Sequence, residues 1–342
     1  MRSLRGPVAS VVALAALTLS ACGTTSDTTA DASATTLTLY NAQHEALMQP
    51  VIDAFEDETG IAVQMRNGDD SELSNLLVQE GEASPADLFV TENSPGMSLV
   101  SDAGLFAELD QDTLEQTPTQ YQPTDGTWVG FAARSTVLVY DARTLDSAGL
   151  PASLMDLADP VWEGRLGISP AGADFQAIVS AVVQLEGEDA AAAWLAGLKA
   201  NAKIYDGNST VMKAVNAGEI DAGVVYHYYW YQDRAEGGDN SANVELHYFG
   251  DQDPGAFLSV SGAGVLASSE HPAEAQQFVA FLTSAQGQAA IAGSKALEYT
   301  IASDAESNPA LPPLSDLDPP VVDPTSLNGP LVVELMQQAG LL

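Results

Sequence analysis

The sequence has very little cysteine and few basic residues. Cys22 is the single cysteine among 342 residues, so neither an intramolecular disulfide nor a cluster of thiolate metal ligands can form. Lysine and arginine number 11 against 47 aspartates and glutamates, and a surface with this excess of negative charge is unsuited to nucleic acid or an anionic membrane surface. We interpret the acidity as a solvated face that favours solubility, and we infer no site from it.

The body of the chain also lacks long apolar runs and compact catalytic motifs. Beyond the N-terminal segment, no apolar stretch is long enough to cross a bilayer. There is no Gly-x-Ser-x-Gly elbow, no His-Glu-x-x-His helix and no internal repeat. We therefore expect a binding protein and not an enzyme. A secreted hydrolase that uses His44 with a serine or a carboxylate is the least favoured alternative.

The N-terminus has the pattern of an export signal. Arg2 and Arg5 precede an apolar stretch, Val8 to Leu19, which is too short for a membrane span and is typical of a secretory signal peptide. The stretch ends in Leu19-Ser20-Ala21-Cys22, which is similar to a bacterial lipobox; the alternative is a stray cysteine in an ordinary signal peptide. We expect a signal peptide over 1–21, lipidation of Cys22 and a flexible tether over 22–35. The mature chain would keep 9 basic and 47 acidic residues, a formal charge of −38, and would be anchored outside the cytoplasmic membrane.

Short apolar strands alternate with helical patterns in the first part of the body. The sequence predicts strands at 37–40, 61–65 and 87–90 and helices at 46–55 and 71–79. This order indicates parallel strands with helices on both faces, and such sheets bind ligands beyond the carboxyl ends of their strands. His44 and Glu92 follow the first and third strands. Each has a plainer interpretation, because His44 could cap the next helix and Glu92 could belong to a first helical turn.

An aromatic run follows a strand in the second part. The sequence predicts strands at 135–140, 166–168, 203–205 and 222–226 and helices at 175–185, 190–200 and 211–216. The run Tyr226-His227-Tyr228-Tyr229-Trp230-Tyr231 begins where the last of these strands ends. Adjacent phenols can supply hard oxygen ligands to a metal, although aromatic runs more often fill a core or a groove. Two lobes that face each other across a cleft would bring the tyrosines opposite His44 and Glu92.

The chain resembles the periplasmic ferric-ion-binding proteins of bacterial ABC importers, in the bilobal solute-binding superfamily. The resemblance covers nearly the whole body and rests on the joint order of short motifs: 40–45 (YNAQHE), 86–92 (ADLFVTE), 162–165 (WEGR), 194–201 (WLAGLKAN), 214–220 (AVNAGEI), the tyrosine pair with Trp230, 253–256 (DPGA) and 261–263 (SGA). It implies an α/β, two-lobe periplasmic-binding-protein (Venus-flytrap) fold with mixed sheets and two hinge crossovers. We expect lobes over 36–135 plus 262–342 and over 136–261, a Pro-rich extended loop over 308–324, and a monomer.

The resemblance also implies a set of ligands. In that family a histidine, a glutamate and two adjacent tyrosines bind ferric iron, and the matching positions here are His44, Glu92, Tyr228 and Tyr229. Ferric iron is a hard ion of charge +3; Glu92 and two phenolates balance that charge, and neutral His44 adds a nitrogen. Generating each phenolate at pH 7 costs about 4 kcal/mol, so the metal must displace the proton and binding should weaken in acid. The family further implies closure of the lobes and docking on an ABC transporter permease.

The sequence departs from the family at the anion site. Family members commonly fill the two remaining octahedral positions with a synergistic anion and water, and phosphate-using members hold the anion at a Ser-Gly-Ala helix N-terminus. Here 170–174 reads Pro-Ala-Gly-Ala-Asp, with Gly172 in place of the serine, and Tyr226 replaces an asparagine. Asn208 matches a second anion-contacting asparagine, or else caps a helix. Gly172, Ala173 and Asn208 are thus a candidate site for carbonate or, less readily, phosphate, and Tyr226 or Asp174 could supply an extra ligand instead.

A second binding function fits the same architecture. Tyrosine and tryptophan walls with carboxylates would also suit an organic cation such as thiamine or a polyamine. Ferric tyrosinate gives a visible charge-transfer band and an organic cation gives none, so a titration separates the two.

Overall fold

The computed structural model describes residues 35–327 and 329–342. The predicted signal peptide over 1–21, Cys22 and the tether up to residue 34 lie outside the described residues. Within the described ranges, no helix has the length and apolarity needed to span a membrane.

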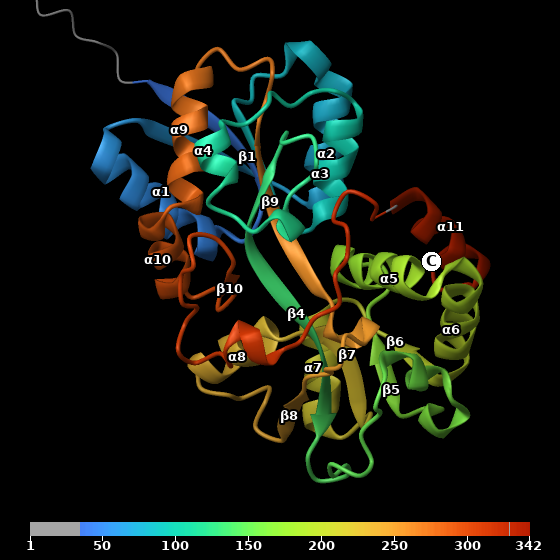
Figure 1. The fold of residues 1–342 in the computed structure, drawn as a ribbon. Coiled ribbons are helices and arrows are strands. Elements are labelled where there is room, and N and C mark those ends of the chain that lie inside the picture. The colour runs from blue at the N-terminus through green and yellow to red at the C-terminus, as the bar shows by residue number, and fades with distance from the viewer. Residues whose placement is uncertain (1–34, 328) are drawn as a thin grey trace, which may run out of the picture. The chain divides into compact units, whose positions relative to one another are not determined.

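One continuous mixed sheet runs through the molecule (Figure 1). Its strand order is β2-β1-β3-β9-β4-β7-β5-β6, and β10 and β8 also pair with β4. The long strand β4 (Val129–Asp141) is antiparallel to β9 (Leu258–Val265) up to Ser135 and antiparallel to β7 (Ala222–Tyr226) from Thr136 onward. This change of partner divides the sheet into an N-terminal lobe and a C-terminal lobe.

The N-terminal lobe has helices on both faces of its sheet, as the alternating pattern predicted (Figure 1). Along β1, Leu37 and Leu39 pack with α1, α9 and α10, whereas Tyr40 and Ala42 pack with α2 and α3. Strand β1 is parallel to β2 and β3, and β9 returns antiparallel to β3. The elements are β1 (Thr36–Ala42), α1 (Glu45–Thr59), β2 (Ala62–Asn67), α2 (Asp70–Glu80), β3 (Leu88–Thr91), α3 (Ser94–Asp102), α4 (Gln111–Leu114), α9 (Pro272–Thr283), α10 (Ala285–Gly293) and β10 (Tyr299–Thr300).

The C-terminal lobe repeats this plan. The side chains of β7 alternate, so that Val224 packs with α5, α6 and α11, and Val225 packs with α7. Strand β5 is parallel to both β6 and β7. The elements are β5 (Leu166–Ile168), α5 (Ala173–Glu186), α6 (Glu188–Asn201), β6 (Ala202–Ile204), α7 (Asn208–Ala217), α8 (Tyr228–Ala235), β8 (Val244–His247) and α11 (Gly329–Gln338).

The last part of the chain differs from the expectation that 262–342 belongs wholly to the N-terminal lobe. Leu327, Val332, Leu335 and Met336 lie in the same apolar core as α5 and α6 of the C-terminal lobe. The physical reason is that α11 has an apolar face, which is buried against the C-terminal lobe. The remaining lobe boundaries stay predictions.

Strands β4 and β9 pass between the lobes, as expected. Residues 301–327 also contact both lobes and form a third connection between them. On the N-terminal side, Ser303 N–H donates to Gln116 O (2.6 Å) and Ser98 Oγ donates to Pro324 O (3.2 Å). On the C-terminal side, Gln252 N–H donates to Asp318 O (3.1 Å) and Gln184 Nε2 donates to Ser326 Oγ (2.5 Å). We call residues 301–327 the strap; Figure 1 shows it in red between α10 and α11.

Two glycines of β9 bring neighbouring elements close to the strand backbone. A Cβ at Gly262 would lie 2.4 Å from Met97 Cγ, and one at Gly264 would lie 2.6 Å from Phe106 Cε1. Because α3 packs closely against β9, the position of the turn that precedes α3 is fixed relative to the sheet.

Candidate metal centre between the lobes

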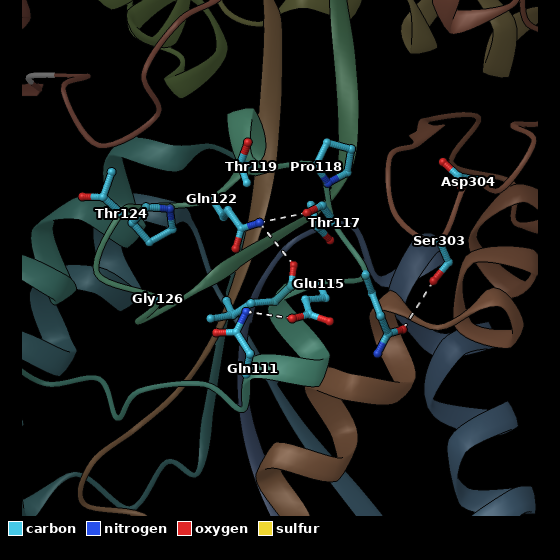
Figure 2. Close-up of a pocket in the computed structure, with 13 residues that line it drawn as sticks. Gln111, Glu115, Thr117, Pro118, Thr119, Gln122, Thr124, Gly126, Ser303 and Asp304 are labelled. Atoms are coloured by element: carbon cyan, nitrogen blue, oxygen red, sulfur yellow. Dashed lines mark hydrogen bonds between the residues drawn. The ribbon is translucent and has the colours of Figure 1, made fainter.

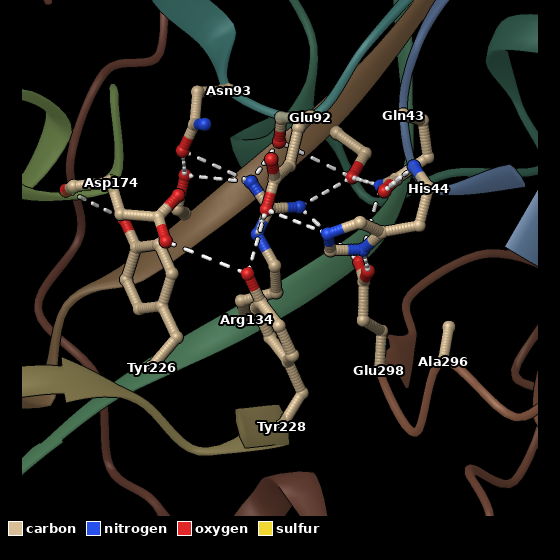
Figure 3. Close-up of polar contacts among 12 residues, drawn as sticks. Gln43, His44, Glu92, Asn93, Arg134, Asp174, Tyr226, Tyr228, Ala296 and Glu298 are labelled. Atoms are coloured by element: carbon tan, nitrogen blue, oxygen red, sulfur yellow. Dashed lines mark hydrogen bonds and ion pairs between the residues drawn. The ribbon is translucent and has the colours of Figure 1, made fainter. Parts of the chain in front are cut away.

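Five polar side chains follow the ends of strands and meet between the lobes. His44 follows β1 and Glu92 follows β3, whereas Asp174 lies in the first turn of α5, and Tyr228 and Tyr229 begin α8. This is the edge at which sheets with parallel strands bind ligands. Figure 3 shows His44, Glu92, Asp174 and Tyr228 gathered around Arg134. The structure thus brings the four predicted ligands together, and their role as ligands stays a prediction.

The ring of His44 is held by the buried carboxylate of Glu298. His44 Nδ1 lies 3.0 Å from Glu298 Oε1, and Nε2 lies 3.7 Å from Glu92 Oε1. A proton on Nδ1 satisfies the buried Glu298 and leaves Nε2 directed toward Glu92. His44 is the N-cap residue of α1 as the alternative allowed, but only its carbonyl accepts from the helix, and its side chain makes no capping hydrogen bond.

Glu92 lies on a turn that is fixed from two sides. The backbone N–H groups of Glu92 and Asn93 donate to the buried carboxylate of Asp70, at 2.9 and 3.1 Å. The guanidinium of Arg134 donates to the Glu92 carbonyl and to Asn93 Oδ1, and its Nε lies 3.5 Å from Glu92 Oε1. Because α3 begins only at Ser94, Glu92 does not belong to a first helical turn, and its carboxylate instead contacts the hydroxyl of Tyr228.

The two tyrosine hydroxyls contact carboxylates of opposite lobes. Tyr228 Oη donates to Glu92 Oε1 (3.2 Å) and lies 3.5 Å from Asp174 Oδ2, and Tyr229 Oη donates to Asp174 Oδ2 (3.1 Å). The edge of the Tyr228 ring meets the His44 ring, with centroids 5.0 Å apart. No three His, Cys, Asp or Glu side chains of residues 35–327 and 329–342 form a metal site by themselves. Any metal centre here therefore includes the phenols.

Burial and negative charge favour the protonated forms of these groups. Burial, together with the charge of Asp174, raises the pKa of Glu92 to about 8. Burial and the same charge raise the pKa of Tyr228 well above its ordinary value. Burial lowers the pKa of His44, but the hydrogen bond to Glu298 and the charge of Glu92 outweigh burial and raise it to about 9. At neutral pH the centre therefore holds protons that a highly charged cation would displace.

The candidate anion-binding residues lie around Asp174. Gly172 is the N-cap of α5 and Ala173 is its first residue, whereas Asn208 begins α7. Asn208 Nδ2 donates to Asp174 Oδ2 (2.8 Å), and the N-cap of α7 is Gly207, so Asn208 is not a helix cap. The hydroxyl of Tyr226 donates to the backbone carbonyl of Asp174 at 3.3 Å. Whether an anion binds here stays untested.

Sequence reasoning missed two residues that support the centre, Arg134 and Glu298. Both are fully buried, and Arg134 Nη1 lies 3.3 Å from Glu298 Oε2 and 2.6 Å from Ser261 Oγ. A signal existed for Arg134, because a charge inside the apolar strand 129–141 requires a buried partner. Nothing near Glu298 in the sequence connects it to His44.

A second hollow in the described part of the chain lies on the N-terminal lobe, away from these residues (Figure 2). It has a cavity volume of about 950 Å³ and is lined by the 111–126 segment together with Ser303 and Asp304. Two side-chain amides of this segment form hydrogen bonds within it: Gln122 Nε2 donates to the carbonyl of Thr117 (2.8 Å), and Gln111 Nε2 donates to Glu115 Oε1 (3.1 Å). It offers neither imidazole nor phenol, so we place the functional site between the lobes.

Comparison with known proteins gives the family. A family of bacterial extracellular solute-binding proteins matches residues 83–319. The chain belongs to the bacterial extracellular solute-binding proteins. This solute-binding protein is 58% identical over 306 residues to the Fe(3+)-binding periplasmic protein of Serratia marcescens, with 90% of each chain covered. It is 37% identical over 308 residues to the major ferric iron-binding protein of Neisseria gonorrhoeae, with 89% of this chain and 93% of the relative covered.

A solved structure also supports the similarity of this solute-binding protein to iron-binding proteins. The structure of iron-bound HitA from Pseudomonas aeruginosa superimposes with a TM-score of 0.84 at 45% identity, covering 90% of this chain and 99% of HitA. The two-lobe α/β fold and the resemblance to periplasmic ferric-ion-binding proteins are thereby confirmed. These relatives are named as binding proteins and not as enzymes.

Proposed function

We propose that the protein binds ferric iron in the cleft outside the cytoplasmic membrane and delivers it to the permease of an ABC importer. The observation that carries the proposal is the contact between Tyr228 Oη and Glu92 Oε1 (3.2 Å), which joins the two lobes at a cluster of hard donors. His44 and Tyr229 complete the ligand set. The names of the relatives support iron as the cargo.

The chemistry of the donors supports iron(III) over a divalent or organic cation. Phenolate and carboxylate oxygens suit a hard trivalent ion, and imidazole is a common ligand of iron. Because ligands from both lobes can bind one ion together only when the lobes are closed, binding favours closure by population shift. The closed form would dock on the permease, with the lipidated Cys22 keeping the protein at the membrane.

The visible spectrum of protein produced in iron-replete medium tests this function. We expect one iron per chain and a charge-transfer band from tyrosinate bound to iron(III), and we expect denaturation to release the metal and abolish the band. Iron-free protein that shows no band when ferric ion is added, but binds thiamine or a polyamine, would instead favour the organic-cation alternative.

A further inference from the structure

We propose that His227 is a positioning residue for the metal centre, which holds the tyrosine pair against the segment that carries Glu298 and so couples the two halves of the centre. This inference rests on the proposed function, since it concerns the same ion. The ring of His227 is fully buried, and both of its nitrogens bind backbone groups. His227 would therefore act on the iron through other residues and not as a ligand.

His227 binds β4 at the residue where that strand passes between the lobes. Ser135 is the last residue of β4 that pairs with β9, and Thr136 is the first that pairs with β7. The His227 N–H donates to Ser135 O (3.0 Å), and the Ser135 N–H donates to His227 Nδ1 (3.1 Å). In a regular antiparallel ladder a backbone carbonyl would accept the second hydrogen bond, but the backbone of His227 is already helical (φ −56°, ψ −37°) and its imidazole accepts instead. The tyrosine pair therefore begins at a point that is fixed to the crossing strand.

The other ring nitrogen of His227 binds the segment before β10, which pairs with β4 on the N-terminal side. His227 Nε2 lies 3.0 Å from Leu297 O, and the next residue, Glu298, holds the ring of His44. Because a backbone N–H can only donate and a carbonyl can only accept, the two partners place the proton of His227 on Nε2. Leu297 has a left-handed backbone (φ 55°), which leucine rarely adopts unless surrounding contacts hold it. His227 is thus one of the contacts that fix the backbone next to Glu298.

A second side chain of α8 contacts the same segment. Gln232 Nε2 donates to Ala296 O (2.8 Å), beside the carbonyl that His227 binds. The ring of Tyr299 also packs against the ring of His227, with centroids 4.8 Å apart. The helix that begins with the tyrosine pair is therefore docked on residues 296–299. The same segment orients His44 through Glu298, so the positions of the phenols and of the imidazole depend on each other.

Substitution of His227 tests this role. His227→Phe keeps a buried aromatic ring but removes both hydrogen bonds of the side chain, whereas His227→Gln keeps one donor and one acceptor. In citrate competition, we expect His227→Phe to lower ferric affinity roughly 10–100-fold, as is typical of residues that support a ligand. We also expect it to shift the maximum of the tyrosinate charge-transfer band. His227→Gln should recover most of the affinity and the wild-type band.

Two results would overturn the positioning role. One is wild-type affinity with an unchanged band in His227→Phe. The other is an equal loss in His227→Phe and His227→Gln, because the hydrogen bonds would then not be responsible. Reduced stability alone would neither shift the band of the iron-loaded form nor be reversed by glutamine.

The matched control is His247→Phe. His247 Nε2 also lies 3.0 Å from a backbone carbonyl, that of Pro151, but His247 belongs to β8. The same substitution there should leave ferric affinity within about twofold of wild type and should not shift the band. An equal loss in both phenylalanine variants would contradict a specific role of His227.

A double-mutant cycle with Glu298→Gln tests the coupling. If His227 acts through residues 297 and 298, the double variant should lose less affinity than the product of the two single losses, because both changes disturb one connection. A loss equal to that product would show that the two residues act independently, and it would overturn the coupling.

The outcomes separate this proposal from the proposed function. Absence of a tyrosinate band in wild-type protein supplied with ferric ion overturns iron binding itself. A wild-type band together with wild-type affinity in His227→Phe overturns only the positioning role. If His227→Phe does not fold, Gln232→Leu removes the other contact of α8 with the segment and should lower affinity about tenfold; wild-type affinity in that variant overturns the proposal.

Discussion

Tyr228 and Tyr229 are neighbours on α8, and both hydroxyls lie near Asp174, but that of Tyr228 also contacts Glu92. Tyr228 Oη meets Glu92 of the N-terminal lobe, and Tyr229 Oη meets Asp174 of its own lobe. The rings stack with centroids 4.2 Å apart. One tyrosine therefore connects the lobes, while the other completes the C-terminal half of the centre.

Removal of either hydroxyl tests the pair. We expect Tyr228→Phe and Tyr229→Phe each to lower ferric affinity by at least about 100-fold, more than the ~10–100-fold of a supporting residue, because each loses a direct ligand. Chelator competition measures the affinity, and circular dichroism checks that the fold survives. Tyr231→Phe, in the same helix, should bind iron like wild type. Unchanged affinity in both ligand variants would remove the pair from the centre.

Under the proposed ligand set, Glu298 would act on iron through His44. In Glu298→Gln, the imidazole loses the carboxylate that orients Nδ1–H, so ferric affinity should fall roughly 10–100-fold. The pKa of His44 should also fall, because the hydrogen bond to Glu298 helps raise it. NMR titration of the His44 ring in iron-free protein measures this shift. The exposed Glu306→Gln should change neither quantity. An unchanged His44 titration would contradict the positioning role.

At the scale of elements, α11 is the least expected part of the structure. Its apolar residues complete the core that α5 and α6 form. This was unexpected, because the sequence assigned the segment to the N-terminal lobe. Lys199 Nζ also donates to the carbonyl of Gly340 (2.6 Å), which holds the end of the chain beside α6. The C-terminus is therefore part of the C-terminal lobe and of its stability.

Truncation of a buried side chain measures that contribution. Met336 is fully buried, so Met336→Ala should lower the free energy of unfolding by about 2–5 kcal/mol through lost burial and a cavity. Val321 on the strap is 76% exposed, and Val321→Ala should stay within about 0.5 kcal/mol of wild type. Urea unfolding of iron-free protein compares the two. Equal, small effects would show that α11 does not contribute to the core.

The sequence predicted the elements that carry regular apolar patterns and the residues at their ends. The strand over 222–226 is confirmed. Strand 135–140 was predicted too short, because Gly130 and Arg134 interrupt the apolar run of β4. Glu298 could not be predicted, because its position beside His44 depends on the two-residue strand β10 pairing with β4. Asp174 was recognised as unusual, but only the structure shows its contact with both phenols.

At the scale of the whole molecule, iron and protons compete for the cleft. Burial and the charge of Asp174 raise the pKa values of Glu92, Tyr228 and Tyr229, so these groups hold protons more strongly in iron-free protein than they would in water. Iron binding must release protons from these groups, so affinity rises with pH and falls on acidification. The protein is therefore suited to hold iron at neutral pH and to lose it in acid.

Acidification tests whether iron affinity falls as the pH is lowered. With citrate as competitor, we expect iron occupancy to fall as the pH is lowered from about 7.5 to 4, and we expect loading at pH 7 to release protons, measured as buffer-dependent heat in calorimetry. Full occupancy down to pH 4 with the competitor present would contradict proton-coupled ligation.

The strap also limits how the two lobes can move. Two bodies joined by two adjacent strands can bend and twist about that pair. The strap adds a third connection that packs against them, because its Leu311 and Leu317 share an apolar core with Val260 of β9. A movement that draws the strap away from either lobe must break the hydrogen bond at Pro324 or the one at Ser326. The strap is therefore a third restraint on the separation of the lobes, besides the two strands.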